Sequence, residues 1–179
     1  MAAAKRRLET GRLTYLRAPT ARDEREFLSL VRASRALHGP WVSAPATPAA
    51  YRSYLTRMRK KDARAFLVCR RADDAIAGVV NVSQIFIGPF RSAYLGYYAF
   101  APSAGAGHMT EGMRLVIRHA FGAMGLHRLE ANIQPANAAS IALVRRCGFR
   151  REGFSPRYLK IGGRWRDHER WAITAEETR

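Results

Sequence analysis

The chain has 179 residues, a length that suits one domain with its own hydrophobic core. Hydrophobic residues make up 47% of it, yet no stretch is long enough to span a membrane, so we expect a soluble cytoplasmic protein. The 31 Lys and Arg outnumber the 14 Asp and Glu, and the net charge of +17 either favours contact with RNA, a ribosome or a phosphorylated cofactor, or serves solubility alone.

The cysteines and histidines do not indicate a disulfide framework or a metal site. Cys69 and Cys147 are far apart and belong to no CxxC motif, which favours reduced thiols. The five histidines lack the spacing of metal ligands, so we predict no metal. The N-terminal stretch MAAAKRRLETGRL has no apolar run after its charged residues, and we expect no signal peptide.

The first half of the chain alternates between strand-like and helix-like patterns. Residues 13–17 predict a strand, and the capping box at 20–23 predicts a helix that carries apolar residues at helical spacing. A loop with two prolines at 38–45 precedes a second predicted helix over 48–61. Three predicted strands joined by turns follow, over residues 65–70, 76–87 and 93–100.

The second half continues this mixed pattern. Apolar residues at helical spacing predict a helix over 109–124, and residues 129–133 predict a strand. Asn137 is expected to cap a helix that ends near Cys147, and a closing hairpin is predicted over 158–173. This order predicts one α/β domain over residues 1–179, with a mixed sheet covered by helices and a flexible segment at 1–10.

The loop APSAGAGHMTEG, residues 101–112, lies between a predicted strand and a predicted helix. Helix N-termini present unpartnered N–H groups, and glycines at 105 and 107 would let a phosphate approach the amides of residues 104–109. A GxG pair also occurs in tight turns that bind nothing. No Lys-Ser or Lys-Thr follows, which excludes a P-loop, and Thr110 replaces the third glycine of a dinucleotide fingerprint. A diphosphate cradle of another kind remains.

The strand before this loop ends at Pro102, and another helix begins at Asn137, directly after a strand. If those two strands splay apart, their free N–H and C=O groups can pair with a peptide-like ligand. Pantetheine has two amide groups and an adjacent diphosphate, so it suits such an edge beside a glycine cradle.

Five short stretches carry a resemblance to a known family: LGYY (95–98), GAGHMTEG (105–112), NAAS (137–140), RCGFRREG (146–153) and GRWRDH (163–168). In this order and spacing, the chain resembles the GNAT acetyltransferase superfamily and is most similar to its RimJ/RimL-type ribosomal-protein N-terminal acetyltransferases. The last stretch, with residues 35–41, favours the RimJ-like branch. The resemblance implies a GNAT fold with a mostly antiparallel sheet of about six to seven strands, splayed in the middle, and about four helices. It also implies acetyl-CoA as co-substrate.

The resemblance further implies which residues hold coenzyme A. Three would pair their backbone with pantetheine: Tyr98, Ala99 and Phe100. Six would cradle the diphosphate: Ala104, Gly105, Ala106, Gly107, His108 and Met109. Asn137 and Ser140 would approach the pantetheine arm or the sulfur. The family usually has Gln or Arg three residues before the first glycine, where this chain has Pro102, but a backbone cradle should still bind.

Acetyl transfer needs a neutral amine, and an α-amino group with a pKa of about 7.7–8.0 meets that need more easily than lysine does. Glu130 is the first candidate for the general base, with the alternative that it merely pairs with Arg128. Ser140 is a candidate to steady or protonate the departing thiolate, or only supports the Asn137 cap. Tyr158 is an alternative acid or a packing residue.

Aromatic side chains are the candidates for the acceptor cleft. Trp41 lies in the proline-rich loop and is expected to line it, whereas Tyr51 and Tyr54 line it or belong to the core. Cys147 lies at a helix C-terminus, where the dipole does not favour a thiolate, so we reject a nucleophilic cysteine.

Three functions follow from these patterns. The first is acetyl transfer, by direct attack in a ternary complex, to the N-terminal α-amino group of a protein such as a ribosomal protein. The second is the same chemistry on a small amine such as an antibiotic, a polyamine or an amino acid. The third is a non-catalytic nucleic-acid-binding module. We expect a monomer or homodimer without membrane contact, and electrostatic contact with RNA or the ribosome is a further hypothesis.

Overall fold

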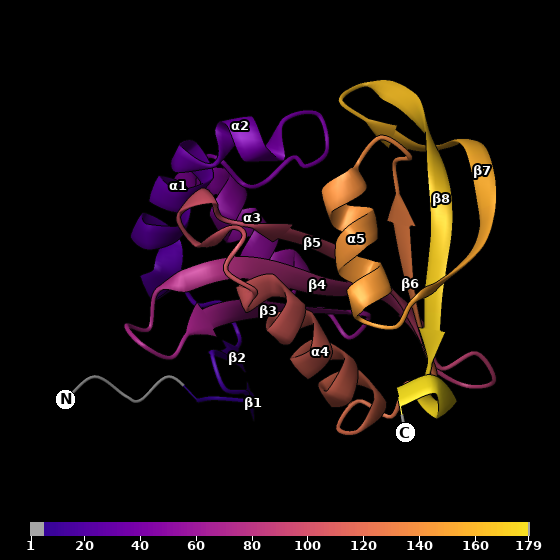
Figure 1. The fold of residues 1–179 in the computed structure, drawn as a ribbon. Helices are drawn as coiled ribbons and strands as arrows, with labels where there is room; N and C mark the ends of the chain where they lie inside the picture. The colour runs from indigo at the N-terminus through magenta and orange to yellow at the C-terminus, as the bar shows by residue number, and fades with distance from the viewer. Residues whose placement is uncertain (1–5, 179) are drawn as a thin grey trace.

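The computed structural model describes residues 6–178, and eight strands within them form one sheet in the order β1-β2-β3-β4-β5-β6-β8-β7 (Figure 1). The strands are β1 (Glu9–Thr10), β2 (Thr14–Arg17), β3 (Ala63–Arg70), β4 (Ile76–Phe86), β5 (Ser92–Ala99), β6 (Arg128–Ile133), β7 (Arg150–Ile161) and β8 (Arg164–Thr174). The helices are α1 (Glu24–Ala33), α2 (Arg35–His38), α3 (Pro48–Arg57), α4 (His108–Phe121) and α5 (Ala138–Arg146). Short 3-10 turns cover Ala21–Asp23, Ala101–Ser103 and Ala175–Thr178.

Each face of the sheet carries its own hydrophobic core. Helices α4 and α5 cover one face, and α1 and α3 cover the other (Figure 1). The alternation of β3 divides its side chains between the two, because Phe66 and Val68 face α4 while Leu67 and Cys69 face α1 and α3. No helix among the described residues is long and apolar enough to cross a membrane.

Helix α4 packs tightly against the sheet at two glycines. A Cβ atom added at Gly112 would come within 2.6 Å of Val68, and one at Gly78 on β4 would come within 2.3 Å of the Met109 sulfur. Glycine at both positions therefore lets the first turns of α4 approach the sheet. This contact fixes where the N-terminus of α4 points.

The predicted fold class is confirmed, with one strand and one α-helix more than the sequence patterns indicate. Within the segment 1–10, expected to be flexible, Glu9 and Thr10 form strand β1, in which Glu9 pairs with Leu16. Residues 1–5 of that segment lie outside the described part. A two-residue strand and the one-turn helix α2 are too short to show a periodicity. Strand β7 also starts at Arg150, earlier than predicted.

Candidate active site

The sheet splays open between β5 and β6. These parallel strands pair only from Ser92 and Arg128 up to Leu95 and Ala131. Beyond that point β5 stays paired with β4, and β6 with β8, so their facing edges have no strand partner. Because β5 and β6 are parallel, the helices that follow them, α4 and α5, begin at the same edge of the sheet. Two helix N-termini therefore flank the predicted opening.

The register decides which backbone groups face the opening. Phe100 N–H bonds to Ala77 O at 2.9 Å, and hydrogen-bonded pairs alternate along an antiparallel ladder, so Tyr98 is directed toward Val79 of β4. The backbone N–H and C=O groups of Tyr97 and Ala99 face the open edge instead. His38 Nε2 already contacts Ala99 O at 2.9 Å. Of the predicted pantetheine contacts, the register thus leaves the Ala99 N–H free for a ligand and adds Tyr97.

The loop before α4 has the conformation that the glycines were expected to provide. Gly105 and Gly107 have φ angles of 77° and 80°, and the turn from Ala104 to Gly107 is exposed. In the described part of the chain, the amides of residues 105–110 have no hydrogen-bond acceptor, whereas Glu111 N–H bonds to Gly107 O at 3.1 Å. Free amides at a helix N-terminus suit a diphosphate, so the residues present fit coenzyme A here.

A carboxylate on the first turn of α4, that of Glu111, ties this end of the helix to the turn between β1 and β2 and so stabilises the cradle. Glu111 accepts hydrogen bonds from the backbone N–H groups of Arg12, Leu13 and Thr14 at 2.8, 2.8 and 2.6 Å, and from the Thr14 hydroxyl at 2.7 Å. Burial disfavours the charge, but these hydrogen bonds outweigh it and hold the pKa of Glu111 below its ordinary value. No local sequence pattern reveals this role of Glu111, because the β1–β2 turn that it binds is distant in sequence.

The N-terminus of α5 brings together a cap and a pair of hydroxyls. Asn137 Oδ1 accepts from Ser140 N–H at 3.1 Å, which confirms the cap. The Ser140 hydroxyl also lies 2.6 Å from the Tyr97 hydroxyl. Burial raises the pKa of Tyr97, so the phenol stays protonated and the pair can hold a proton. Tyr97 was missed as a site residue because only the fold brings it to Ser140.

A cavity of about 330 Å³ crosses the opening between the strands. Its walls come from β4, β5, β6, the α5 N-terminus, the loop after α2 and the β7–β8 hairpin. Residues that line it include Trp41, Gln84, Tyr94, Tyr97, Asn132, Asn137, Ser140, Tyr158, Leu159 and His168. No Asp, Glu, Lys or Arg of the described residues is among them. The described cavity wall is therefore polar and lacks both carboxylates and the cations of Lys and Arg.

The aromatic candidates divide between the cavity and the core. Trp41 and Tyr158 line the cavity, and the Tyr158 ring lies 6.2 Å from that of the buried His168. Tyr51 and Tyr54 are instead core residues, with 0% and 2% exposure.

Asn132 is a cavity residue that the sequence patterns did not reveal. Its side-chain oxygen is buried and has no hydrogen-bond partner among the described residues. Such an acceptor is costly to leave unpaired, which marks it as a group that a ligand can satisfy.

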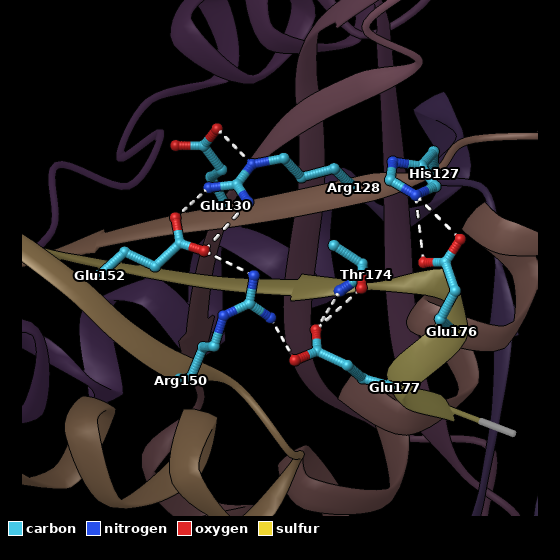
Figure 2. Close-up of polar contacts among 8 residues, drawn as sticks. All are labelled: His127, Arg128, Glu130, Arg150, Glu152, Thr174, Glu176 and Glu177. Atoms are coloured by element: carbon cyan, nitrogen blue, oxygen red, sulfur yellow. Dashed lines mark hydrogen bonds and ion pairs between the residues drawn. The ribbon is translucent and has the colours of Figure 1, made fainter.

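Glu130 lies on the same face of β6 as Asn132 but not in the cavity wall. Figure 2 shows its carboxylate paired with Arg128, at 2.9 Å, at one end of a chain of charges. Arg128 also binds Glu152, which binds Arg150 at 2.7 Å, and Arg150 binds Glu177. The ion pair with Arg128, expected as the alternative, is thus present, and the role of base stays a prediction.

Cys147 has no sign of a nucleophile. Burial raises the pKa of its thiol to about 11, and its sulfur lies 3.7 Å from Thr110 O. The thiol is protonated near neutral pH, in agreement with its rejection from the sequence.

Comparisons with known proteins point to one family. Residues 12–150 match the family described as an acetyltransferase (GNAT) domain. A probable N-acetyltransferase of Bacillus subtilis, YjcK, is 37% identical over 120 residues, 67% of this chain and 66% of its own length. The [ribosomal protein uS5]-alanine N-acetyltransferase of Escherichia coli is 39% identical over 102 residues, 57% of this chain and 53% of its own length. The chain thus spans about two thirds of one curated relative and about half of the other.

A solved structure extends the likeness to the fold. Mycobacterium smegmatis RimJ, in complex with CoA-disulfide, matches with a TM-score of 0.85 and 30% identity, over 92% of this chain and 83% of its own. The family match covers the splayed strands, the glycine turn and the capped helix α5. The chain therefore belongs to the acetyltransferase (GNAT) family, a family of acyltransferases that use acetyl-CoA as co-substrate.

Proposed function

We propose that the chain transfers the acetyl group of acetyl-CoA to the N-terminal α-amino group of a protein, such as a ribosomal protein. The observation that carries this proposal is the cavity across the β5–β6 opening. It is lined both by the N-terminus of α5 and by Trp41, the residue expected in the acceptor cleft. The cradle at residues 105–110 would hold the diphosphate, and the open edge of β5 would pair with pantetheine. The amine can then attack the thioester directly, within a ternary complex.

The lack of carboxylates in the described cavity wall supports a peptide N-terminus as acceptor. A polyamine keeps further ammonium groups after one nitrogen binds, and each would need a carboxylate that the cavity wall does not offer. A peptide continues instead as a neutral backbone. The Escherichia coli relative that modifies the alanine of a ribosomal protein supports the same class. A small amine with one amino group is the second candidate, because about 330 Å³ also accommodates it.

The chemistry can be divided among the groups around the cavity. Asn132 Oδ1 accepts an N–H of the incoming amine and orients its lone pair toward the thioester carbon. As the C–N bond forms and the C–S bond breaks, the Ser140–Tyr97 pair donates a proton to the thiolate and recovers one from solvent. Glu130 lies outside the cavity wall, so it takes the surplus proton of the attacking nitrogen through water and releases it to solvent. Tyr158 is the alternative acid.

The test is release of free thiol from acetyl-CoA with three kinds of acceptor. The first is a panel of short peptides that begin with Ala, Ser or Thr. The second is the same panel with a blocked N-terminus and one internal lysine, and the third is a set of small amines that includes spermidine. We expect product on the first set alone. Turnover confined to the small amines would overturn the proposed acceptor.

A further inference from the structure

Helix α3 and the turn after it carry a dense group of cations. Residues 52–64 contain six Lys and Arg and a single acid, Asp62. All six cations are exposed. We call them the α3 basic surface: Arg52, Arg57, Arg59, Lys60, Lys61 and Arg64.

Most of these cations lack the neutralising partner that many cations have elsewhere. Arg118, Arg128 and Arg150 all lie in ion pairs with Glu residues. Within residues 6–178, only Arg52 of the α3 basic surface has a carboxylate within 4.0 Å, that of Glu24 at 3.7 Å. Like charges held within a Debye length of about 10 Å repel one another, and a bound polyanion relieves that repulsion.

The exposed side of α3 is also hollowed. A shallow groove of about 550 Å³ is lined by Ala49, Arg52, Ser53, Thr56, Arg57 and Lys60. Cations beside hydroxyl groups are the side chains that contact phosphate oxygens of nucleic acids. Among the residues that the structure describes, no aromatic side chain lines the groove, so these residues offer no platform on which bases stack. Its chemistry therefore fits a phosphate backbone without base readout.

The α3 basic surface borders the wall of the acceptor cavity. Asp62, within the same turn, accepts a hydrogen bond from Ile85 N–H at 3.0 Å through its carbonyl oxygen. The next residue, Ala63, pairs with Ser83 of β4, and Ser83 lines the cavity. A polyanion bound to this surface would thus lie next to a strand pair that contributes to the cavity wall.

We propose that the α3 basic surface binds the phosphate backbone of RNA and so delivers an RNA-bound acceptor protein to the cavity. The delivery step rests on the proposed function, but RNA binding does not. An acidic polypeptide is the competing partner. It fits less well, because a polypeptide would need a run of consecutive acidic residues to match six neighbouring cations, whereas RNA carries a negative charge at every nucleotide.

The test compares two triple variants that remove the same charge. The first, R57Q/K60Q/K61Q, alters the α3 basic surface. The control, R25Q/R32Q/R35Q, alters exposed arginines of α1 and α2 that have no ion pair within the described residues. The probe is a fluorescein-labelled oligouridylate of 20 nucleotides, and anisotropy measures its affinity at several salt concentrations.

We expect the wild type and the control to bind with similar, steeply salt-dependent affinity. The first variant should lose about ten- to a hundredfold in affinity at 0.1 M salt, and its slope against log salt should fall by about 2 for three lost phosphate contacts. Equal losses in both variants would reduce the effect to net charge and overturn the proposal. Loss of binding to a polyglutamate peptide, with oligouridylate binding intact, would assign the surface to an acidic protein.

The same variants separate this inference from the proposed function. On a short free peptide, R57Q/K60Q/K61Q should release thiol from acetyl-CoA at the wild-type rate, because the altered residues lie outside the cavity wall. If no peptide is acetylated but RNA binding depends on the α3 basic surface, the proposed acceptor is wrong and the proposed RNA site is supported. If peptides are acetylated but RNA binding does not depend on this surface, the acceptor is supported and the RNA site is wrong.

Discussion

Replacing Glu111 with Gln tests whether the brace behind the cradle positions the N-terminus of α4. The carboxylate accepts four hydrogen bonds of 2.6 to 2.8 Å from the β1–β2 turn. In the variant, one oxygen becomes an NH₂ group that faces N–H donors, and the remaining bonds lose their charge. At about 1.5–3 kcal/mol for a bond to a charged group and about 1 kcal/mol for a neutral one, the variant should lose about 3 kcal/mol of stability.

The effect on coenzyme A binding separates positioning from charge. Glu111 lies in the first turn of α4, so loss of its negative charge alone would strengthen binding of an anionic diphosphate. Loss of the brace should instead let the turn at 105–110 shift and weaken binding. We expect Glu111→Gln to raise the KM for acetyl-CoA about tenfold, with little change in kcat, because the acceptor side is untouched.

Urea unfolding and titration calorimetry with coenzyme A measure the two effects. The control is Arg118→Gln, which breaks the exposed pair with Glu9 farther along the same helix and should cost less than about 1 kcal/mol. The pKa of Glu111 is lowered from 4.5 in the folded protein. Its contribution to the free energy of unfolding is therefore present above pH 4.5 and is lost as the pH falls through the folded-state pKa. Wild type and Glu111→Gln should thus converge in acid. Tighter binding of coenzyme A by Glu111→Gln would refute the positioning role.

Three further predictions concern the site itself. Ser140→Ala and Tyr97→Phe should each lower kcat about a hundredfold, and the double variant no further, since the two hydroxyls act as a pair 2.6 Å apart; additive losses in the thiol assay would separate their roles. Glu130→Gln should slow turnover most at low pH, where little amine is neutral, with normal acetyl-CoA affinity, and an unchanged pH–rate profile would remove it from the mechanism. Gly107→Ala, at a φ of 80°, should lower the free energy of unfolding by about 1 kcal/mol and weaken coenzyme A binding in calorimetry. Gly125→Ala, at a φ of 63° and away from the cradle, should lower the free energy of unfolding in urea equally but leave coenzyme A binding unchanged.

Sequence patterns predicted the parts of the fold that depend on local periodicity. The apolar spacing of α4 and the glycines at 105 and 107 follow from local geometry, because a helix buries one face and a positive φ favours glycine. Strand β1 has only two residues and gains its place from pairing with β2, so no local pattern reveals it.

The site depends more on long-range contacts than the fold does. Only the register between β4 and β5 shows that Tyr97, and not Tyr98, faces the opening. Likewise, the unpartnered oxygen of Asn132 and the brace by Glu111 exist only once distant segments meet. The cations of residues 52–64 are visible in the sequence, but their lack of partners is not, because ion pairing is decided in three dimensions.

A crystal structure of the protein with coenzyme A would show directly whether the opening between β5 and β6 is the acetyl-CoA site. We expect the diphosphate on the amides of residues 105–110 and pantetheine along the backbone of Tyr97 and Ala99, with the sulfur near Ser140. A diphosphate bound elsewhere, with the turn at 105–110 free of ligand, would contradict the assignment of the cradle and of the chemistry built on it.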